Sequence, residues 1–285
     1  DGRFVAVGAG ATAPTCVWEL PPPHSDGAPA LRLRLDAHEG GVQSLAFSPT
    51  SRGAPALATL GLQDGELRIH SLIDGALLLK ADVPPMLHVL GWRHDGSELS
   101  AGGADGLLSW QVDALWDGVD TRPMEMLPIR CCPPTMHNDD GLPTPPAHVT
   151  AIAYLEPPPF TLVGDAAGGV SLWGAAGDEV PLVGWSCASK VGEVDLLHAA
   201  AVGGAHELKW LVVVGGGGKA KSIYRYTLSI TPDADVEWSL LSEVALDGRL
   251  TAMCWPTAAA AQGVVGTAAG NIFHVHWGPA TATPL

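Results

Sequence analysis

Two glycine-rich segments of the chain have spacings that could bind phosphate groups. Residues 8–13 (Gly-Ala-Gly-Ala-Thr-Ala) follow an apolar run and match the G-x-G-x-x-A pattern of dinucleotide-binding loops. Such a loop must open a helix whose N-terminus meets the pyrophosphate. Here Pro14 comes next, and residues 15–18 (Thr-Cys-Val-Trp) are typical of a strand. The pattern therefore predicts a turn between strands and no nucleotide site.

The second segment, residues 215–222 (Gly-Gly-Gly-Gly-Lys-Ala-Lys-Ser), resembles a phosphate-binding loop. A Walker A motif needs Ser or Thr directly after its Gly-Lys pair, so that a hydroxyl can bind magnesium. Ala220 occupies that position, after Lys219. We therefore expect a flexible turn between two strands.

Histidines and acidic residues could bind metal ions at two places. His274 and His276 lie on one face of an expected strand, but no C-x-x-C or H-x-x-x-H motif adds the third and fourth ligands that zinc requires. Asp139 and Asp140 lack the twelve-residue loop pattern of a calcium-binding EF-hand. The sequence contains no G-x-S-x-G motif either. We therefore expect a protein that is not an enzyme, with no catalytic residues, no metal ligands and no cofactor.

A recurring phrase shows which elements carry these residues. Residues 105–110 (Asp-Gly-Leu-Leu-Ser-Trp) and 168–173 (Gly-Gly-Val-Ser-Leu-Trp) each place an apolar run ending in Trp after a glycine turn, and residues 64–69 repeat the phrase with Ile69 last. An apolar run, a turn and a second run predict two antiparallel strands. Gly65 and Gly106 stand 41 residues apart. That spacing is typical of repeats of about 40–45 residues, which bury their apolar faces by stacking on one another.

The phrase at residues 37–49 (Ala-His-Glu-Gly-Gly-Val, then Ser-Leu-Ala-Phe-Ser-Pro) resembles the most recognisable part of a WD40 repeat. The resemblance covers nearly the whole chain and implies an all-β, WD40-like β-propeller of four-stranded antiparallel blades over residues 1–285. We expect a partial blade at 3–20 and blades at about 30–71, 76–112, 123–174, 180–228 and 236–277. Because Asp1 begins in the middle of a motif, we expect an incomplete ring or a piece of a larger multi-propeller protein, with the remainder of that chain as a partner.

The resemblance also assigns structural repeat positions: Trp18, His38, Asp64, Asp105, Trp110 and Trp173. In WD40 blades a His, a Ser or Thr, an Asp and a Trp form a hydrogen-bond network. Here it can be at most partial, through His38, Asp64 and Ile69, since Ile69 cannot form hydrogen bonds. Arg225 stands where a Trp is expected in the fourth pass. We therefore expect packing to replace the network and the blades to be irregular.

The charge of the chain restricts its partners. The formal net charge is −15, which argues against nucleic acid and anionic membranes, because both attract clustered Lys and Arg. No stretch reaches about 18 consecutive apolar residues, the length needed to span a bilayer. Five scattered cysteines favour a reducing compartment such as the cytoplasm.

We expect the partners to be other proteins. Possible contacts are the basic side chains of Arg32, Arg34, Lys219 and Lys221, together with the proline-rich interruptions at 20–29 and 133–146. Residues 264–275 resemble the last blades of large WD-repeat proteins of centrioles and cilia, of the centriolar inner-scaffold and echinoderm-microtubule-associated-protein-like types. That resemblance implies a non-enzymatic structural component of a centriole or axoneme, in the cytoskeleton, that binds tubulin or scaffold proteins. The alternatives are an adaptor of a ubiquitin ligase, coat or transport complex and, more remotely, an enzyme with a propeller fold.

Overall fold

A computed structural model describes residues 3–8, 10–11, 13–22, 25–49, 54–84, 86–104, 106–112, 129–131, 148–156, 160–174, 182–187, 192–202, 208–216, 221–231, 235–255, 262–278 and 281–284. The chain forms two compact units, Asp1–Arg130 and Cys131–Leu285. All regular structure in the described residues is β-strand, which confirms the all-β prediction. None of these residues belongs to a helix that is long and apolar enough to cross a membrane.

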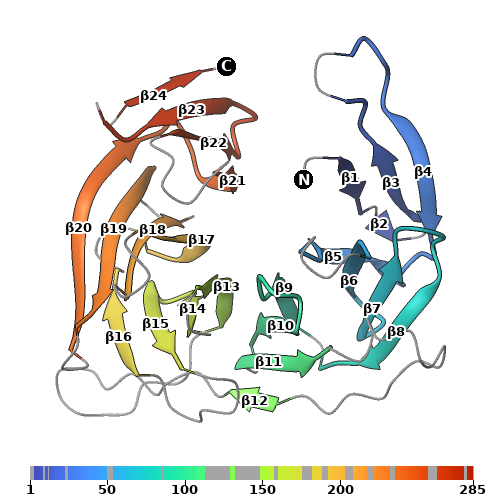
Figure 1. Ribbon diagram of the computed structural model, residues 1–285, viewed down its shortest axis with the longest axis horizontal. Helices are drawn as coiled ribbons and strands as arrows, with labels where there is room; N and C mark the ends of the chain where they lie inside the picture. Colours follow the sequence, from blue (N-terminus) through green and yellow to red (C-terminus); the bar gives the residue numbers. More distant parts are fainter. Residues whose placement is uncertain are drawn as a thin grey trace. The chain divides into compact units, whose positions relative to one another are not determined.

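The first unit contains three antiparallel sheets (Figure 1). The first sheet has the order β1-β3-β4 and the second the order β2-β5-β6-β7-β8. Their strands are β1 Phe4–Val7, β2 Gly10–Ala11, β3 Thr15–Glu19, β4 Ala30–Leu35, β5 Gly40–Phe47, β6 Ala56–Gly61, β7 Glu66–Ser71 and β8 Leu77–Asp82. The third sheet, β12-β11-β10-β9, contains β9 Leu87–Trp92, β10 Glu98–Gly103, β11 Gly106–Gln111 and β12 Ile129–Cys131, the strand in which the first unit ends.

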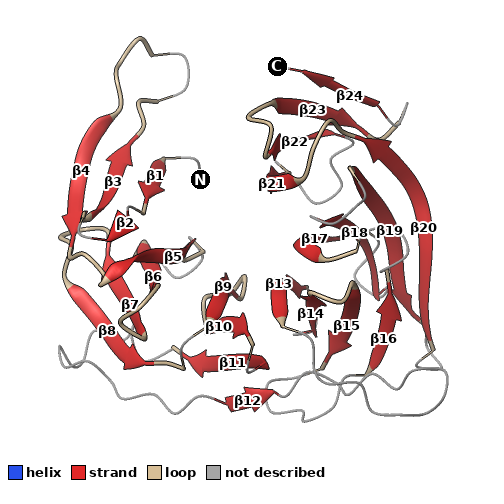
Figure 2. Cartoon of the chain, turned by 180° about the vertical axis from the view of Figure 1, so that it is seen from behind, coloured by secondary structure: helices blue, strands red, loops and turns tan. Residues whose placement is uncertain are grey.

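The second unit contains three sheets of four strands each, which meander in chain order. The strands of its first two sheets are β13 Val149–Leu155, β14 Phe160–Asp165, β15 Gly169–Trp173, β16 Val183–Ser186, β17 Val194–Ala201, β18 Leu208–Gly216, β19 Ser222–Ile230 and β20 Val236–Ala245. The last sheet contains β21 Leu250–Cys254, β22 Gln262–Thr267, β23 Ile272–His276 and β24 Thr281–Pro284. Figure 2 shows these meanders from behind as strands joined by loops.

The turns that the sequence marks with glycine lie between the second and third strands of the sheets. Gly65, Gly106, Gly168 and Gly270 all have positive φ, which favours glycine because it lacks a Cβ. The sheets run one strand out of phase with the repeats read from the sequence. For example, β4 pairs with β3, which precedes it, and not with the strands of residues 40–71. Each outer strand is hydrogen-bonded to the strand before it, so the outer strand completes the preceding sheet.

Two of the six sheets differ from the expected four strands. The first has three strands, and the second gains a fifth because Gly10 and Ala11 of β2 pair with Gly41 and Gly40 of β5. This β2 lies in the segment that resembles a dinucleotide-binding loop. Its flanking strands β1 and β3 pair antiparallel, from Phe4 with Glu19 to Val7 with Cys16. The segment is therefore a β-turn region and does not form the strand–helix unit that a dinucleotide requires.

Each hydrophobic core of a unit lies between consecutive sheets. In the first unit, one core joins the β1-β3-β4 sheet to the next through Val17, Leu35, Leu57 and Leu72, and another includes Ile69, Leu99 and Trp110. In the second unit, one core contains Leu172, Trp210 and Tyr226, and another contains Val213, Val265 and Trp277. No single sheet encloses its own apolar face. The sheets therefore stabilise one another by stacking, as the sequence repeats predict.

Candidate functional site

The most complete polar cluster of the structure lies in the second sheet and is formed by His38, Thr59 and Asp64. His38 Nδ1 is 2.8 Å from Asp64 Oδ2, and His38 Nε2 is 2.8 Å from Thr59 Oγ1. The Asp64 carboxylate only accepts, so Nδ1–H donates to it, and Nε2 accepts from the Thr59 hydroxyl. The hydrogen-bond partners thus select one neutral tautomer of a ring that is only 1% exposed.

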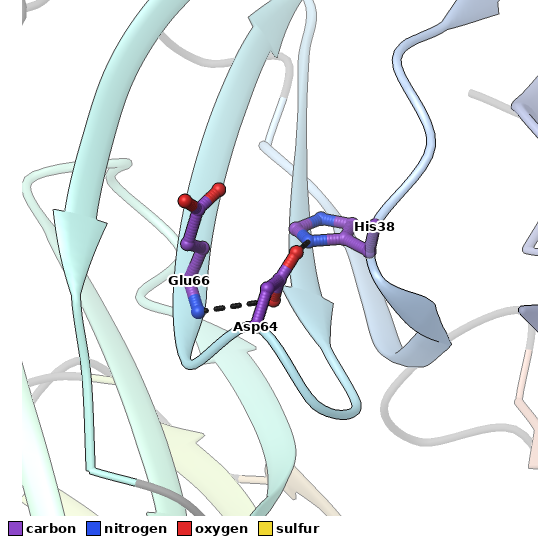
Figure 3. A group of neighbouring side chains, drawn as sticks. All are labelled: His38, Asp64 and Glu66. Atoms are coloured by element: carbon purple, nitrogen blue, oxygen red, sulfur yellow. Dashed lines mark hydrogen bonds and ion pairs between the residues drawn. The ribbon is translucent and has the colours of Figure 1, made fainter. Parts of the chain in front are cut away.

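Backbone amides hold the Asp64 carboxylate in place. Oδ2 accepts from the N–H of Glu39 at 3.1 Å, and Oδ1 accepts from the N–H of Glu66 at 3.1 Å (Figure 3). Asp64 thereby ties the segment before β5 to the turn between β6 and β7. Gly61, at the end of β6, leaves room for this arrangement, because a Cβ there would lie 1.8 Å from Asp64 Oδ1 and 2.5 Å from His38 Nδ1.

The pKa shifts of the pair agree with this geometry. Burial lowers the pKa of His38 by more than its hydrogen bond to Asp64 raises it, so the ring is neutral at pH 7. Burial raises the pKa of Asp64. The hydrogen bonds from His38 and from the backbone amides of Glu66 and Glu39 lower it by more, so the pKa of this carboxyl lies below its usual value. The pair is therefore a neutral imidazole bonded to a carboxylate.

His38, Asp64 and Glu66 also have the residue types of a metal site, since their ligand atoms lie within 4.8 Å of one another. Each of these atoms already has a partner. Glu66 accepts from Arg68 Nη2 at 2.6 Å and pairs with Lys80 Nζ at 2.5 Å, and both nitrogens of His38 are bonded as described above. A metal ion would have to displace these contacts, so the cluster is better explained as a structural network.

The structure thus brings together His38 and Asp64, two of the predicted repeat positions, and adds Thr59, which sequence reasoning missed. Three of the four members of the network that the WD40 resemblance predicts are present, and Ile69 packs in the core in place of the fourth. The network is therefore partial in this sheet, as the sequence predicts, and apolar packing replaces only its fourth member. The missed signal was a threonine in the middle of an Ala/Leu-rich strand, on the strand between His38 and Asp64.

Other sheets have different polar contacts at their turns. Asp165 Oδ1 accepts from the amides of Ala167 at 2.8 Å and Gly169 at 2.7 Å. In the last sheet, Asp247 precedes the first strand and accepts from Thr267 Oγ1 at 2.9 Å and from Asn271 Nδ2. The Asp247 contacts again join the segment before a first strand, a second strand and a turn, with different residue types, whereas those of Asp165 stay within the turn between β14 and β15. They account for irregularity among the sheets.

The predicted tryptophan positions are buried to different degrees. Trp110 is 1% exposed and Trp173 is 3% exposed, whereas Trp18 on β3 is half-buried. Trp173 donates from Nε1 to Ser171 Oγ at 2.9 Å, in its own strand. Asp105 lies outside the described residues.

The predicted partner contacts are divided between the two units. Arg32 and Arg34 are exposed on β4, where Arg32 Nη2 donates to the backbone oxygen of Ile73 at 3.4 Å. Lys221 is exposed before β19, in the other unit, and Lys219 lies outside the described residues. The proline-rich segment 133–146 also lies outside them, and of residues 20–29 only 23 and 24 do.

A feature that sequence reasoning missed recurs on the first strand of five sheets. The register between the first and second strands shifts at one residue in each, so that this residue has no partner and forms a β-bulge. The bulged residues are Gln43, His88, Thr150, Asp195 and Thr251. All five are polar, and each follows a Val or a Leu. That Val/Leu–polar pair at the start of each first strand is the signal that could have revealed them.

Four of the five bulged residues contact a neighbouring sheet of their own unit. Gln43 Nε2 lies 3.3 Å from His88 Nδ1, so two bulges of the first unit meet. In the second unit, Thr150 Oγ1 donates to the backbone oxygen of Val194, and Arg249 donates from Nη2 to Asp195 Oδ2 at 2.9 Å. The bulges therefore place polar side chains along the ends of successive first strands.

The two remaining chemical motifs lie on or next to strands, and residues 217–220 of the first lie outside the described residues. Residues 208–216 and 222–230 are the antiparallel strands β18 and β19, so the Walker-like segment joins two neighbouring strands. His274 and His276 lie side by side on β23, with ring centroids 4.3 Å apart at 65°. Neither belongs to a cluster of three potential metal ligands among the described residues.

Comparison with known proteins defines the class of fold. No family model matches the sequence, and no curated protein matches it. The structure is similar to the crystal structure of the Myceliophteria thermophila Cps50 (Swd1) β-propeller domain, with a TM-score of 0.70 and 16% sequence identity. The match covers 100% of this chain and 83% of that chain. The chain therefore has a WD40-like β-propeller fold whose blades are the six antiparallel sheets, which confirms the predicted fold class.

Proposed function

We propose that this chain is a non-enzymatic protein-interaction scaffold. The observation that carries the proposal is the set of polar bulges at the start of the first strands of five sheets. Bulges redirect side chains, and they occur preferentially at rims and next to binding sites. Gln43 and Thr251 are exposed. A repeated polar residue at a position that contributes nothing to strand pairing favours a role in recognition.

The chemistry of these side chains suits a protein partner. They are amide, imidazole, hydroxyl and carboxylate groups, and they provide both hydrogen-bond donors and hydrogen-bond acceptors. Arg249 and Asp195 add an ion pair, with Arg249 52% exposed. The net charge of −15 disfavours nucleic acid and anionic membranes as alternatives. The free cysteines Cys16, Cys187 and Cys254 support a reducing, cytoplasmic compartment.

Within this function we propose a structural role in a centriole or axoneme, with tubulin or scaffold proteins as partners. Support comes from the resemblance of residues 264–275, which cover the end of β22 and most of β23, to the last blades of WD-repeat proteins of cilia and centrioles. The net charge of −15 counts against broad contact with an acidic microtubule wall, so contacts would be local. An adaptor role in a ubiquitin ligase, coat or transport complex is the competing assignment.

Proximity labelling of the full-length protein in cells tests both assignments. Enrichment of centriolar or ciliary proteins is the expected result, whereas enrichment of ligase, coat or transport subunits would favour the adaptor role. Partners found in this way are then tested in vitro with the double variant Gln43→Arg/Thr251→Arg. We expect it to weaken binding at least tenfold.

Two further variants separate the possible surfaces. Arg32→Glu/Arg34→Glu tests the basic outer strand, and Lys209→Glu changes an exposed residue to which no role is assigned. If the bulges form the recognition surface, neither variant should change binding by more than about twofold. Full loss of binding in Arg32→Glu/Arg34→Glu, with normal binding of the bulge variant, would overturn the assignment to the bulges.

A further inference from the structure

Two histidines lie side by side on one face of strand β23. His274 and His276 are two residues apart, so in a β-strand their side chains lie on the same side of the sheet. The alternate residues Phe273 and Val275 are buried in the core that the last sheet shares with its neighbour, so the histidines lie on the opposite face. The two imidazole rings have centroids 4.3 Å apart and an interplanar angle of 65°. The strand therefore holds two imidazoles as close neighbours.

This face of the last sheet is open to solvent. Gln262 and Thr281 pair with His276 from the two adjacent strands, and both are exposed. Val264, which pairs with His274, is 38% exposed. Within the described part of the chain, neither imidazole has a hydrogen-bond or ion-pair partner, and no ring nitrogen of either is a buried atom without a partner. The ring nitrogens therefore reach solvent and are available to an ion that arrives from it.

The distance between the rings indicates which ion they can bind together. An imidazole nitrogen binds a transition-metal ion at about 2.0–2.1 Å, which places the ring centroid about 3.2 Å from the ion. Two imidazoles at a right angle around one ion then have centroids about 4.5 Å apart, whereas the tetrahedral angle separates them by about 5.2 Å. The observed separation of 4.3 Å matches the right angle. Right-angled ligands are typical of square-planar or tetragonal Cu²⁺ and Ni²⁺, and tetrahedral ligands are typical of Zn²⁺.

We propose that His274 and His276 form a bidentate site for a divalent metal ion of tetragonal geometry, with Cu²⁺ bound most tightly. Imidazole suits both Cu²⁺ and Ni²⁺, and the affinity of such ligands rises through the divalent series to a maximum at Cu²⁺. The two histidines occupy adjacent corners of the equatorial plane of the ion, and water occupies the other positions. A structural zinc site requires four protein ligands, whereas this ion keeps its waters on the open face of the sheet. The site does not depend on the proposed scaffold function.

Titration of the purified chain with Cu²⁺, followed by electron paramagnetic resonance, tests the site. With one equivalent of Cu²⁺ we expect the hyperfine pattern of two equatorial nitrogens. His274→Gln and His276→Gln should each leave at most one nitrogen in that pattern and weaken Cu²⁺ binding at least tenfold. Loss of a residue that only orients a metal ligand typically costs 10–100-fold in affinity, so loss of a ligand should cost at least as much. Circular dichroism should show that every variant is folded, because both substitutions are on the open face.

His94→Gln is the matched control, because His94 is an exposed histidine in the first unit with no histidine two residues away. It should leave both the spectrum and the affinity unchanged. Unchanged Cu²⁺ affinity in His274→Gln and His276→Gln would show that the two rings do not bind one ion, and would overturn the proposal. We expect Ni²⁺ to bind more tightly than Zn²⁺, and the reverse order would overturn the tetragonal geometry. Because no partner protein enters this assay, its failure is distinguishable from failure of the scaffold function.

Discussion

His38 and Asp64, 26 residues apart in the chain, are joined by a hydrogen bond of 2.8 Å that links the segment before β5 to the turn before β7. Thr59, on the strand between them, bonds the other ring nitrogen of His38. The imidazole thereby links three segments of one sheet by hydrogen bonds: its own segment before β5, the strand β6 and the turn before β7. Because the ring is almost fully buried, loss of either partner leaves a polar atom without compensation.

Thr59→Val tests this network. Valine has nearly the shape of threonine, so the change removes the hydroxyl and leaves His38 Nε2 unpaired. We expect the free energy of unfolding, measured by urea denaturation, to fall by about 1–3 kcal/mol. The control is Thr227→Val, whose hydroxyl is 3.5 Å from the backbone oxygen of Ser239 at an exposed position and should contribute no more than about 0.5 kcal/mol. Equal effects of the two substitutions would show that the network contributes no stability.

Gly61→Ala tests the space that the network requires. The new Cβ would lie 1.8 Å from Asp64 Oδ1, so the carboxylate must move and its bond to His38 must break or lengthen. We expect destabilisation of about 1–3 kcal/mol or more, in the range of overpacked cores. Gly278→Ala is the matched control, since a Cβ there meets nothing within 4 Å. A Gly61→Ala protein as stable as the control would mean that the pair occupies a different position.

The sequence predicted this sheet well because its signals are local. Glycine at the turns, alternating apolar residues and the phrase around His38 each depend on a few neighbouring residues. Asp64 could be found in the same way, from its place before the turn glycine Gly65. Thr59 could not, because a single threonine in an apolar strand looks the same whether or not its hydroxyl faces a histidine.

The features that the sequence did not predict correctly depend on hydrogen-bonded pairing between segments that are separate in the chain. That β4 joins the preceding sheet is decided by its hydrogen bonds to β3, and no residue type in Ala30–Leu35 encodes that choice. The added strand β2 arises from pairing of Gly10 and Ala11 with β5. A bulge likewise exists only relative to a partner strand, so it remained hidden until the registers were known. The recurring Val/Leu–polar pair becomes informative once the first strands are aligned with one another.

The free energy of unfolding should decrease as pH is lowered from 7 to 5, because of His70. His70 is 3% exposed, its Nδ1 has no hydrogen-bond partner among the described residues, and burial together with the charge of Arg68 lowers its pKa to about 4. An unfolded histidine has a pKa of about 6.5, so below that pH the unfolded chain binds a proton that the folded chain does not. The stabilisation is therefore present above pH 6.5 and is lost as pH falls toward 4. His38, whose pKa burial also lowers, acts in the same direction.

Urea denaturation at pH 7 and pH 5 measures this effect, above the range in which most carboxylates titrate. His70 alone should account for a loss of about 2 kcal/mol over that interval. His70→Leu keeps an apolar side chain in the core and should reduce the pH-dependent loss by about the same amount, whatever its own stability at pH 7. An unchanged difference between the two pH values in His70→Leu would contradict the assignment to this residue.

The stacked pair Trp185 and Trp238 should couple two sheets of the second unit. Trp185 lies on β16 and Trp238 on β20, with ring centroids 4.6 Å apart at 14°, and Tyr226 stacks on Trp238 at 4.5 Å. Aromatic pairs in such contact contribute about 0.5–1.5 kcal/mol beyond the area they bury. In a double-mutant cycle with Trp185→Leu and Trp238→Leu, the double variant should therefore be less destabilised than the sum of the singles by about 0.5–1.5 kcal/mol. Trp238 and Trp277 belong to different cores and should be additive within about 0.5 kcal/mol. If the first cycle proved as additive as the second, the Trp185–Trp238 stack would contribute no coupling free energy. The two sheets would then be coupled by their aliphatic core alone.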